Sequence, residues 1–284
     1  MFGFNRPSLD VCGRTVLVTG AGSGIGAATA RALHERGAAL ALVDVDEIAV
    51  KKIAVELGGD ALAMSADVRD RAAMAAVVDR TVANFGRLDI VVANAGVAPP
   101  AATIRTVDAD AFDRVLDINV TGVFNTVRPA LEHVIERRGH VVVVASAAAF
   151  APGAGGSPYM MSKAAVEQFG RALRIELAAV GASAGIAYFG VVETPMVRDN
   201  ESDPLIKEIT GLLPWPLSRR ISQEHAARVI ADAIANRSAQ TIAPASWLPY
   251  SLLRGVANLL IDDHAAASKS MHELLRRVEA RASA

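Results

Sequence analysis

Residues 14–26 read RTVLVTGAGSGIG, which is an apolar run, a glycine-rich turn and the start of a helical pattern that ends at Gly37. Glycines in such a turn let backbone N–H groups approach a phosphate at the positive end of a helix. Ile25 stands where the third glycine of the common G-x-G-x-x-G pattern would be. A glycine turn by itself is a weak signal, and the strands that follow give it weight.

A second apolar run, residues 38–43, ends at Asp44, which lies eighteen residues after Gly26. A carboxylate at this distance from a glycine turn is typical of the group that binds the adenosine ribose of a dinucleotide. Val45 and Ser23 are uncharged, and Asp44 would repel a ribose 2′-phosphate, which would find no arginine nearby. The pattern therefore predicts NAD as the cofactor rather than NADP. The alternative is that Asp44 is only a turn residue at a strand end.

Strand-like and helix-like stretches alternate along the residues that follow. Helical spacing over residues 46–57 and 70–85 alternates with apolar runs at 61–66 and 89–93. Such alternation predicts an α/β fold, in which right-handed crossovers build one doubly wound, Rossmann-type parallel sheet with helices on both faces. We expect about seven strands in a single domain over residues 1–284.

Polar and small residues follow two of these strands, at the edge where a parallel sheet binds its ligands. Asp67 ends one strand, and Asn94, Ala95 and Gly96 end the next. Asp67 can accept a hydrogen bond from an adenine amino group, and the small Ala95–Gly96 pair allows a flat backbone wall against a cofactor. As the alternative, these are ordinary loop residues.

Composition excludes several other classes of protein. Hydrophobic residues are 52% of the chain and charged residues 21%, which is ample for a covered core and excludes a disordered chain. The formal net charge of −1 predicts no nucleic-acid partner. The six histidines show no metal-ligand spacing, so we expect no metal, and the single Cys12 fits a reducing compartment. Residues 1–7 are too short and interrupted for a signal peptide, so we expect a cytoplasmic protein.

Residues 141–179 bring together three side chains that can perform acid/base chemistry. A four-valine strand leads to Ser146, and after a Gly/Pro-rich loop an amphipathic helix begins, with Ser157 as its expected cap. Tyr159 and Lys163 are four residues apart and therefore share one face of that helix. An ammonium close to a phenol favours the phenolate, so the pair can move a proton. The alternative is a core tyrosine and a solvated lysine.

A long helical pattern over residues 109–138 contains Asn119 in its interior. An asparagine is mildly unfavourable there because its amide competes for backbone hydrogen bonds. Solvent exposure is one explanation. The Val120-Thr121-Gly122 sequence that follows favours another, a local break in the helix that turns the Asn119 carbonyl toward the site.

Together these motifs resemble the short-chain dehydrogenase/reductase family over residues 14–245. The matching motifs, in chain order, are Thr-Gly-x-x-x-Gly-x-Gly at residues 19–26, the ribose-binding acid at Asp44, Asp67-Val68, Asn94-Ala95-Gly96, and the catalytic tetrad at Asn119, Ser146, Tyr159 and Lys163.

The resemblance implies a role for each of these residues. Tyr159 would be the general acid/base, Ser146 would orient the substrate oxygen, and Lys163 would lower the pKa of Tyr159 while holding the ribose. Asn119 would anchor a water that links Lys163 to solvent. The implied cofactor-binding residues are Thr19, Gly20, Gly22, Ser23, Gly24, Ile25, Gly26, Asp44, Val45, Asp67, Val68, Asn94, Ala95, Gly96, Tyr159, Lys163, Gly190, Val192 and Thr194.

Two positions depart from the family pattern. Ala93 stands where the family often has a further asparagine, and Phe189 replaces the proline of a Pro-Gly pair. Gly190, Val192 and Thr194 still match, so the contacts to nicotinamide and pyrophosphate are expected to be kept. The substitution at residue 189 leaves the local backbone shape open.

Large apolar side chains gather in the expected substrate lip, residues 206–217, and in residues 247–261, where an extension over residues 246–284 begins. Gly255 is among the residues that interrupt the second run, so it is not expected to span a membrane. A charged amphipathic helix is expected from Ala265. We expect the extension to fold back near the lip, or to come from a neighbouring subunit, and to enclose a lipophilic alcohol or ketone. The alternative, of equal weight, is that the extension only packs against the body of the protein or against another subunit.

The resemblance implies an NAD-dependent oxidoreductase that interconverts a secondary, lipophilic alcohol and its ketone or aldehyde by hydride transfer. An epimerase or dehydratase on the same fold is an alternative, and a catalytically idle NAD-binding regulator or scaffold is another. The intact tetrad argues against the idle protein. Family members pair through two long helices, here residues 109–138 and 157–180, so we expect a homodimer or homotetramer.

Overall fold

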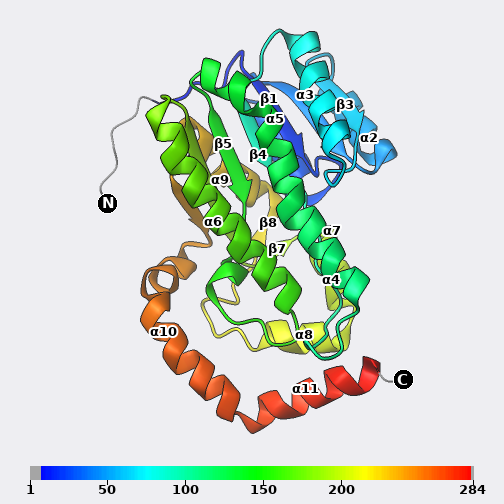
Figure 1. Ribbon diagram of the computed structural model, residues 1–284, viewed down its shortest axis with the longest axis vertical. Coiled ribbons are helices and arrows are strands. Elements are labelled where there is room, and N and C mark those ends of the chain that lie inside the picture. The colour runs from blue at the N-terminus through cyan, green and yellow to red at the C-terminus, as the bar shows by residue number, and fades with distance from the viewer. Residues whose placement is uncertain (1–7, 283–284) are drawn as a thin grey trace.

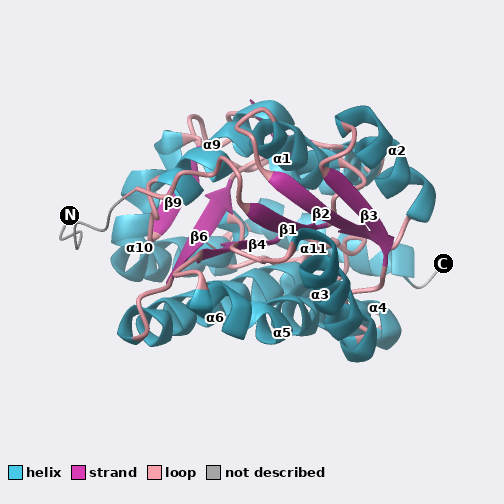
Figure 2. Ribbon diagram, turned by 90° about the horizontal axis from the view of Figure 1, so that it is seen from above, coloured by secondary structure: helices cyan, strands magenta, loops and turns pink. Residues whose placement is uncertain are grey.

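A computed structural model describes residues 8–282, and residues 1–7, on which the expectation of no signal peptide depends, lie outside this range. The central sheet has seven strands, all parallel, in the order β3-β2-β1-β4-β5-β6-β9. Helices cover both faces of this sheet (Figure 2). The predicted doubly wound α/β fold is confirmed. Its strands are β1 (Thr15–Thr19), β2 (Ala39–Asp44), β3 (Ala61–Ser65), β4 (Ile90–Ala93), β5 (His140–Val144), β6 (Ser183–Phe189) and β9 (Gln240–Ala243).

The central strands are apolar along their whole length because helices cover both of their faces. Every residue of β1, β4, β5 and β6 is buried. Alternate residues of β1 enter different cores: Val16 and Val18 pack on one face and Leu17 on the other. One face carries α1 (Gly24–His34), α2 (Glu47–Leu57) and α9 (Gln223–Ala235), and the other carries α3 (Arg71–Phe85), α4 (Ala109–Leu116), α5 (Gly122–Glu136) and α6 (Ser157–Ala179).

One expectation about the helices is confirmed and another needs correction. The long helix expected over residues 109–138 is divided by a π-helical turn, Asp117–Thr121, so the predicted break near Asn119 is present. The predicted cap of α6 is wrong by one position, because Gly156 is the N-cap residue and Ser157 is the first residue of the helix. The Ser157 hydroxyl is buried without a hydrogen-bond partner and therefore caps nothing.

The far end of the chain forms a separate group of elements beyond the carboxyl edge of the sheet (Figure 1). It contains β7 (Val192–Glu193), β8 (Ile221–Ser222), α7 (Pro195–Glu201), α8 (Pro204–Gly211), α10 (Leu248–Ala267) and α11 (Lys269–Ala282). Gly255 interrupts the apolar run but not the helix, because α10, 20 residues in all, includes that residue. A single glycine weakens a helix without ending it. Within residues 8–282, no helix is both long enough and apolar enough to cross a membrane.

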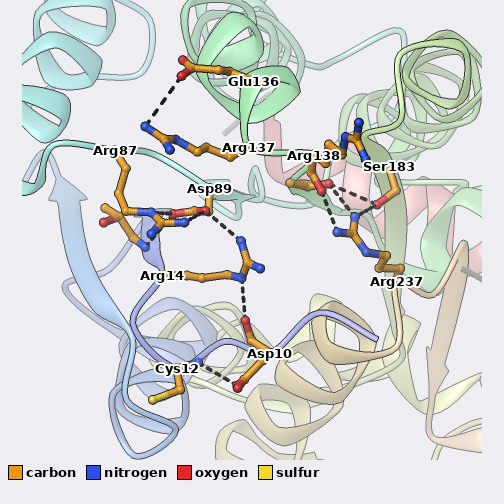
Figure 3. A network of polar contacts seen from close by, with 12 residues as sticks. Asp10, Cys12, Arg14, Arg87, Asp89, Glu136, Arg137, Arg138, Ser183 and Arg237 are labelled. Carbon is orange, nitrogen blue, oxygen red and sulfur yellow. Dashed lines mark hydrogen bonds and ion pairs between the residues drawn. The ribbon is translucent and has the colours of Figure 1, made fainter. Parts of the chain in front are cut away.

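A buried carboxylate ties together the opposite edge of the sheet (Figure 3). The Asp89 side chain is fully buried; Arg87 donates to both of its oxygens at 2.6 Å and Arg14 to Oδ1 at 2.9 Å. The backbone N–H of Thr15 donates to Oδ2 at 3.1 Å. Burial works to raise the pKa of Asp89, but the hydrogen bonds from Arg87, Thr15 and Arg14 outweigh it and lower the pKa. This network joins the start of β1 to the start of β4 and leaves the carboxyl edge free for a ligand.

Candidate active site

A cleft of ≈ 360 Å³ opens at the carboxyl edge of the sheet. Four of the expected residues, Thr19, Gly22, Gly26 and Asn119, do not line it but contact residues that do. The expected residues that line it are Gly20, Ser23, Gly24, Ile25, Asp44, Val45, Asp67, Val68, Asn94, Ala95, Gly96, Ser146, Tyr159, Lys163, Gly190, Val192 and Thr194.

The glycine turn after β1 is held by close backbone packing. A Cβ atom at Gly26 would lie 2.0 Å from the carbonyl oxygen of Gly20, so only glycine fits there. Thr19 Oγ1 accepts hydrogen bonds from the backbone N–H groups of Asn94 (3.1 Å) and Ala95 (3.2 Å). Asn94 Nδ2 donates in return to the Thr19 carbonyl oxygen at 2.9 Å. These bonds join the ends of β1 and β4 into one wall of the cleft.

The N-terminus of α1 faces the cleft without a side-chain cap. Ser23 is the N-cap residue, but its side chain makes no capping hydrogen bond, and the first turn of α1 contains no acidic residue. Ser23, Gly24 and Ile25 all line the cleft. Uncapped N–H groups at the positive end of a helix bind anions. This part of the cleft therefore fits the pyrophosphate of a dinucleotide.

Asp44 ends β2 beside the glycine turn. Its Oδ2 accepts a hydrogen bond from the Gly22 N–H at 2.8 Å, and its Oδ1 accepts one from the Asp46 N–H at 3.0 Å. The carboxylate is therefore fixed in place by two backbone donors before any ligand binds. Val45, the next residue, is 69% exposed at the rim of the cleft and adds no charge.

Two arginines that the sequence reasoning missed also line the cleft, Arg69 and Arg114. Arg69 follows β3, and because β3 pairs with β2 so that Ser65 lies beside Asp44, Arg69 shares the cleft with Asp44. The expectation that no arginine lies near Asp44 is wrong for the cleft as a whole. The Arg69 guanidinium donates to Asp67 Oδ2 at 2.6 Å, and this hydrogen bond lowers the pKa of Asp67. The sequence signal that could have predicted this contact is the position of Arg69, two residues after the strand-end Asp67.

The π-helical turn places the Asn119 side chain where it joins two walls of the cleft. Its Oδ1 accepts from the Val97 N–H at 2.8 Å, and its Nδ2 donates to the Val97 carbonyl oxygen at 2.9 Å. The same Nδ2 donates to Ser162 Oγ at 2.9 Å, and Ser162 Oγ donates to the Tyr159 carbonyl oxygen at 2.7 Å. The buried amide thus connects the segment after β4 to the first turn of α6. Its expected role in anchoring a water stays a prediction.

Ser146 and Tyr159 meet at the far end of the cleft. Ser146 follows β5; its hydroxyl donates to the Phe189 carbonyl oxygen at 3.2 Å and accepts from the Ala148 N–H at 3.1 Å. Burial raises the pKa of Tyr159, and its hydrogen bond with Ser146 acts in the opposite direction. Both side chains line the cleft.

Lys163 lies one helical turn after Tyr159 and is buried. Its Nζ is 5.6 Å from the centre of the Tyr159 ring and donates to the Val144 carbonyl oxygen at 3.1 Å. Burial lowers the pKa of Lys163 to about 8. A Cβ atom at Gly96 would come within 3.4 Å of Nζ, so this glycine leaves room for the ammonium. The cleft therefore holds a cation at its base, beside a phenol and a serine hydroxyl.

Comparison with known proteins agrees with this geometry. The family model for short chain dehydrogenases matches residues 14–205. The chain belongs to the short-chain dehydrogenase family.

Individual relatives extend this result. Cis-4-hydroxycyclohexanecarboxylate dehydrogenase of Sinomonas cyclohexanicum is 38% identical over 221 residues, which cover 77% of this chain and 88% of that protein. The probable oxidoreductase EphD of Mycobacterium tuberculosis is 43% identical over 187 residues, 64% of this chain, and the match spans only 31% of EphD. Among solved structures, 3-ketoacyl-(acyl-carrier-protein) reductase from Brucella melitensis, complexed with NADH, has a TM-score of 0.73 at 27% identity, over 82% of this chain and 97% of that chain.

In this short-chain dehydrogenase, Phe189 stands in place of the expected proline and continues β6. Phe189 pairs with Ala243 of β9, and Gly190, the next residue, donates its N–H to the Ala243 carbonyl oxygen at 2.9 Å. A Cβ atom at Gly190 would lie 2.5 Å from Trp247 Nε1, so any side chain at residue 190 would clash with this indole. The backbone whose shape was left open is therefore a strand held against β9 and Trp247.

The C-terminal extension of this short-chain dehydrogenase folds back over the expected substrate lip. Leu274 and Val278 of α11 are buried, 3% and 1% exposed. Arg277 of α11 donates to Glu208 of α8 at 2.7 Å. On its other side α11 reaches the segment after β4, because Glu279 accepts from Thr103 Oγ1 at 2.9 Å. The expected folding back near the lip is confirmed for α11.

Proposed function

We propose that this protein is an NAD-dependent alcohol dehydrogenase or carbonyl reductase, with Tyr159 as its general acid/base. The observation that carries the proposal is that Tyr159, Ser146 and the buried Lys163 line the same cleft, the one that fits a dinucleotide, with the Lys163 Nζ 5.6 Å from the centre of the Tyr159 ring. A proton-transfer group has to lie within hydrogen-bond reach of the reacting oxygen, and these residues offer one such position.

Each residue has a definite task in alcohol oxidation. A nicotinamide held in the cleft would supply the acceptor for the hydride of the carbinol carbon. Ser146 holds the substrate oxygen by a hydrogen bond, and the phenolate of Tyr159 takes the hydroxyl proton as the C=O bond forms. The Lys163 ammonium, whose Nζ is 5.6 Å from the centre of the Tyr159 ring, would favour the phenolate by its charge and act against the burial that raises the pKa of Tyr159. In the direction of reduction, Tyr159 returns the proton to the carbonyl oxygen.

Three observations support NAD over NADP. The Asp44 carboxylate is fixed beside the glycine turn by the N–H groups of Gly22 and Asp46, where it can accept hydrogen bonds from the ribose hydroxyls and would repel a 2′-phosphate. The Arg69 guanidinium, which could have offset this repulsion, is already paired with Asp67. The Brucella reductase, which is similar in structure, was solved with NADH.

A lipophilic secondary alcohol is the substrate class that we propose. Apolar residues of α8 and α11 enclose the loop that precedes Tyr159: a Cβ atom at Gly155 would lie 3.3 Å from Ile209 and 3.9 Å from Leu275. Met196 adds an apolar residue to the cleft itself. The name of the Sinomonas relative specifies a secondary alcohol on a cyclohexane ring that also carries a carboxylate, so it agrees with the alcohol part of this class.

Tyr159→Phe tests the proposal, with Tyr188→Phe as the matched control. The Tyr188 side chain is buried outside the cleft, so removal of its hydroxyl should leave turnover near that of the native protein. Tyr159→Phe should bind NAD nearly as the native protein does while its turnover falls by ~10²–10⁴-fold, because only the transferable proton is lost. Nicotinamide absorbance over a panel of secondary alcohols and ketones, with calorimetric titration of NAD, measures both quantities.

Three results would overturn parts of this assignment. Near-native turnover by Tyr159→Phe removes Tyr159 from the role of acid/base. If the protein binds NAD but oxidises or reduces no alcohol or ketone, the alternative of a catalytically idle regulator or scaffold is supported instead. Conversion of a sugar or hydroxy acid without net change of the nicotinamide indicates the epimerase or dehydratase. The cytoplasmic location stays a prediction from the sequence.

A further inference from the structure

Helix α10 turns its polar side chains toward the rest of the protein. Asn258 Nδ2 donates to the Phe150 carbonyl oxygen at 2.8 Å, and Tyr250 Oη donates to Asn258 Oδ1 at 2.7 Å. Arg254 forms an ion pair with the buried Glu167 of α6, and its guanidinium lies 4.8 Å from the centre of the Phe150 ring. Tyr250, Arg254 and Asn258 are four residues apart and therefore form one stripe. Polar contacts thus hold α10 on the body.

The opposite face of α10 is apolar and exposed. No residue of this helix is buried, although it is 20 residues long. A surface helix of a globular protein normally shows the reverse pattern, with its apolar stripe toward the core and its polar face toward water. Contiguous exposed apolar surface of this kind marks a binding surface. The residues of this outer face expose 63–73% of their surface and are Leu252, Leu253, Val256, Leu259 and Leu260.

A glycine lies midway along α10, at the border of this outer face. Gly255 is three residues after Leu252 and four before Leu259, so it lies close to both on the helix surface. A Cβ atom at Gly255 would meet nothing within 4 Å, so no contact within the chain requires a glycine there. Glycine destabilises the interior of a helix relative to alanine, and its value is that another backbone can approach closely. The position suits the crossing point of a second helix.

The charges of α10 favour a second copy of this helix over a lipid surface. Arg254 is the only lysine or arginine of α10, and it is turned inward to Glu167. Asp262 and Asp263 are exposed toward the C-terminal end, where they would be repelled by anionic lipid. In an antiparallel pair, these two carboxylates of each copy lie toward the positive N-terminal end of the other helix.

We infer that two copies of this protein associate through the outer faces of their α10 helices, which cross at Gly255. The contact is isologous, because an antiparallel pair of identical helices brings each apolar residue against the same surface of the other copy. This interface is separate from the two long helices on which the sequence-based expectation of an oligomer depends. It also explains why polar side chains, rather than leucines, attach α10 to its own subunit.

Charge substitutions on the outer face test the inference. Leu252→Asp combined with Leu259→Asp should halve the mass measured by light scattering, because two buried carboxylates would face two more across the pair. The matched control is Val55→Asp on α2, which is 82% exposed and away from α10, and it should keep the native mass. Circular dichroism of both variants should match the native protein, since every substituted side chain is exposed. A native mass near 29.6 kDa overturns the inference, and so does an unchanged mass in the double variant.

A cross-link gives a second, independent measurement. Cys12 is the only cysteine of the chain, so Cys12→Ser provides a background without thiols. Val256→Cys in that background should form a covalent dimer on mild oxidation, because the two-fold crossing brings the two copies of residue 256 together. Val55→Cys should stay monomeric on denaturing gels. No covalent dimer from Val256→Cys would contradict the crossing at Gly255. If the native protein is monomeric and sediments with phosphatidylcholine vesicles, the outer face of α10 binds a lipid surface and the inference of a second copy is overturned.

Discussion

Cofactor choice is decided at the level of two adjacent side chains, Asp44 and Val45. Asp44→Ala with Val45→Arg should weaken NAD by roughly 10–100-fold, since a hydrogen bond to a charged group contributes about 1.5–3 kcal/mol. The same double variant should strengthen NADP, because the repelling carboxylate is replaced by a guanidinium. Fluorescence titration with both cofactors measures the ratio. Asp60→Ala, another exposed aspartate of the chain, is the control and should change neither affinity. A native protein that already prefers NADP would contradict this interpretation of Asp44.

Lys163 should make stability depend on pH in a predictable direction. Its pKa is about 8 in the folded protein, against 10.5 when exposed. Between these values the unfolded state binds more protons than the folded state, so the free energy of unfolding rises with pH. Above pH 10, the raised pKa of Tyr159 reverses the trend, because the unfolded phenol ionises while the buried one stays neutral.

Urea unfolding of Lys163→Met between pH 8 and 10 tests this linkage. The variant should lose the rise in stability that the native protein shows over this range and should be more stable than the native protein at the acidic end. Lys52→Met removes an exposed lysine of α2 and controls for the change in net charge. Equal pH slopes in native protein and Lys163→Met would show that Lys163 is not desolvated.

At the level of elements, α11 is the part of the extension that is tied to the substrate end. Leu274→Asp should undock this helix, because the side chain is 3% exposed and a buried carboxylate without a partner is costly. We expect NAD affinity to stay unchanged while kcat/KM for bulky alcohols falls roughly 10-fold or more, since each lost apolar contact in a pocket has about that effect. Arg276→Asp alters an exposed residue of the same helix and serves as the control. Unchanged use of bulky alcohols by Leu274→Asp would limit α11 to a structural role.

The π-helical turn shows how one element serves two purposes. Its extra residue breaks the run between α4 and α5 and places Asn119 where both ends of its amide are bonded. Such turns inside α-helices are frequent at functional sites. An asparagine that was unfavourable in a regular helix is therefore fully satisfied in this one.

At the level of the whole molecule, the two edges of the sheet have different tasks. The edge at the strand starts is closed by the buried Asp89 network, and the opposite edge carries the cleft, α8 and α11. Helix α10 lies at the periphery of this second edge (Figure 1). Its apolar face is exposed. Assembly through α5 and α6 stays a prediction, and the mass of the α10 variants distinguishes the two surfaces. Substitution of the exposed Ile175 of α6 by aspartate is the corresponding test of assembly through α5 and α6.

The sequence by itself determined the sheet and the position of the cleft. Continuous apolar strands, the glycine turn and the residues at strand ends are local patterns, and the topology of a parallel sheet brings all strand ends to one edge. Gly20, Asp44, Asn94, Ser146 and Tyr159 therefore meet in the structure as their positions predicted. The helix of Tyr159 and Lys163 was recognisable because a spacing of four residues is enough to place both on one face.

The tertiary structure decided what depends on contacts between distant segments. Arg69 reaches the cleft of Asp44 only because β2 and β3 are neighbours, and α11 covers α8 only through pairs such as Arg277 and Glu208. The direction in which α10 turns its apolar face was also not visible, because helical periodicity tells which residues share a face but not which face the body covers. Here the polar stripe found partners in Phe150 and Glu167, and the leucines were left outside.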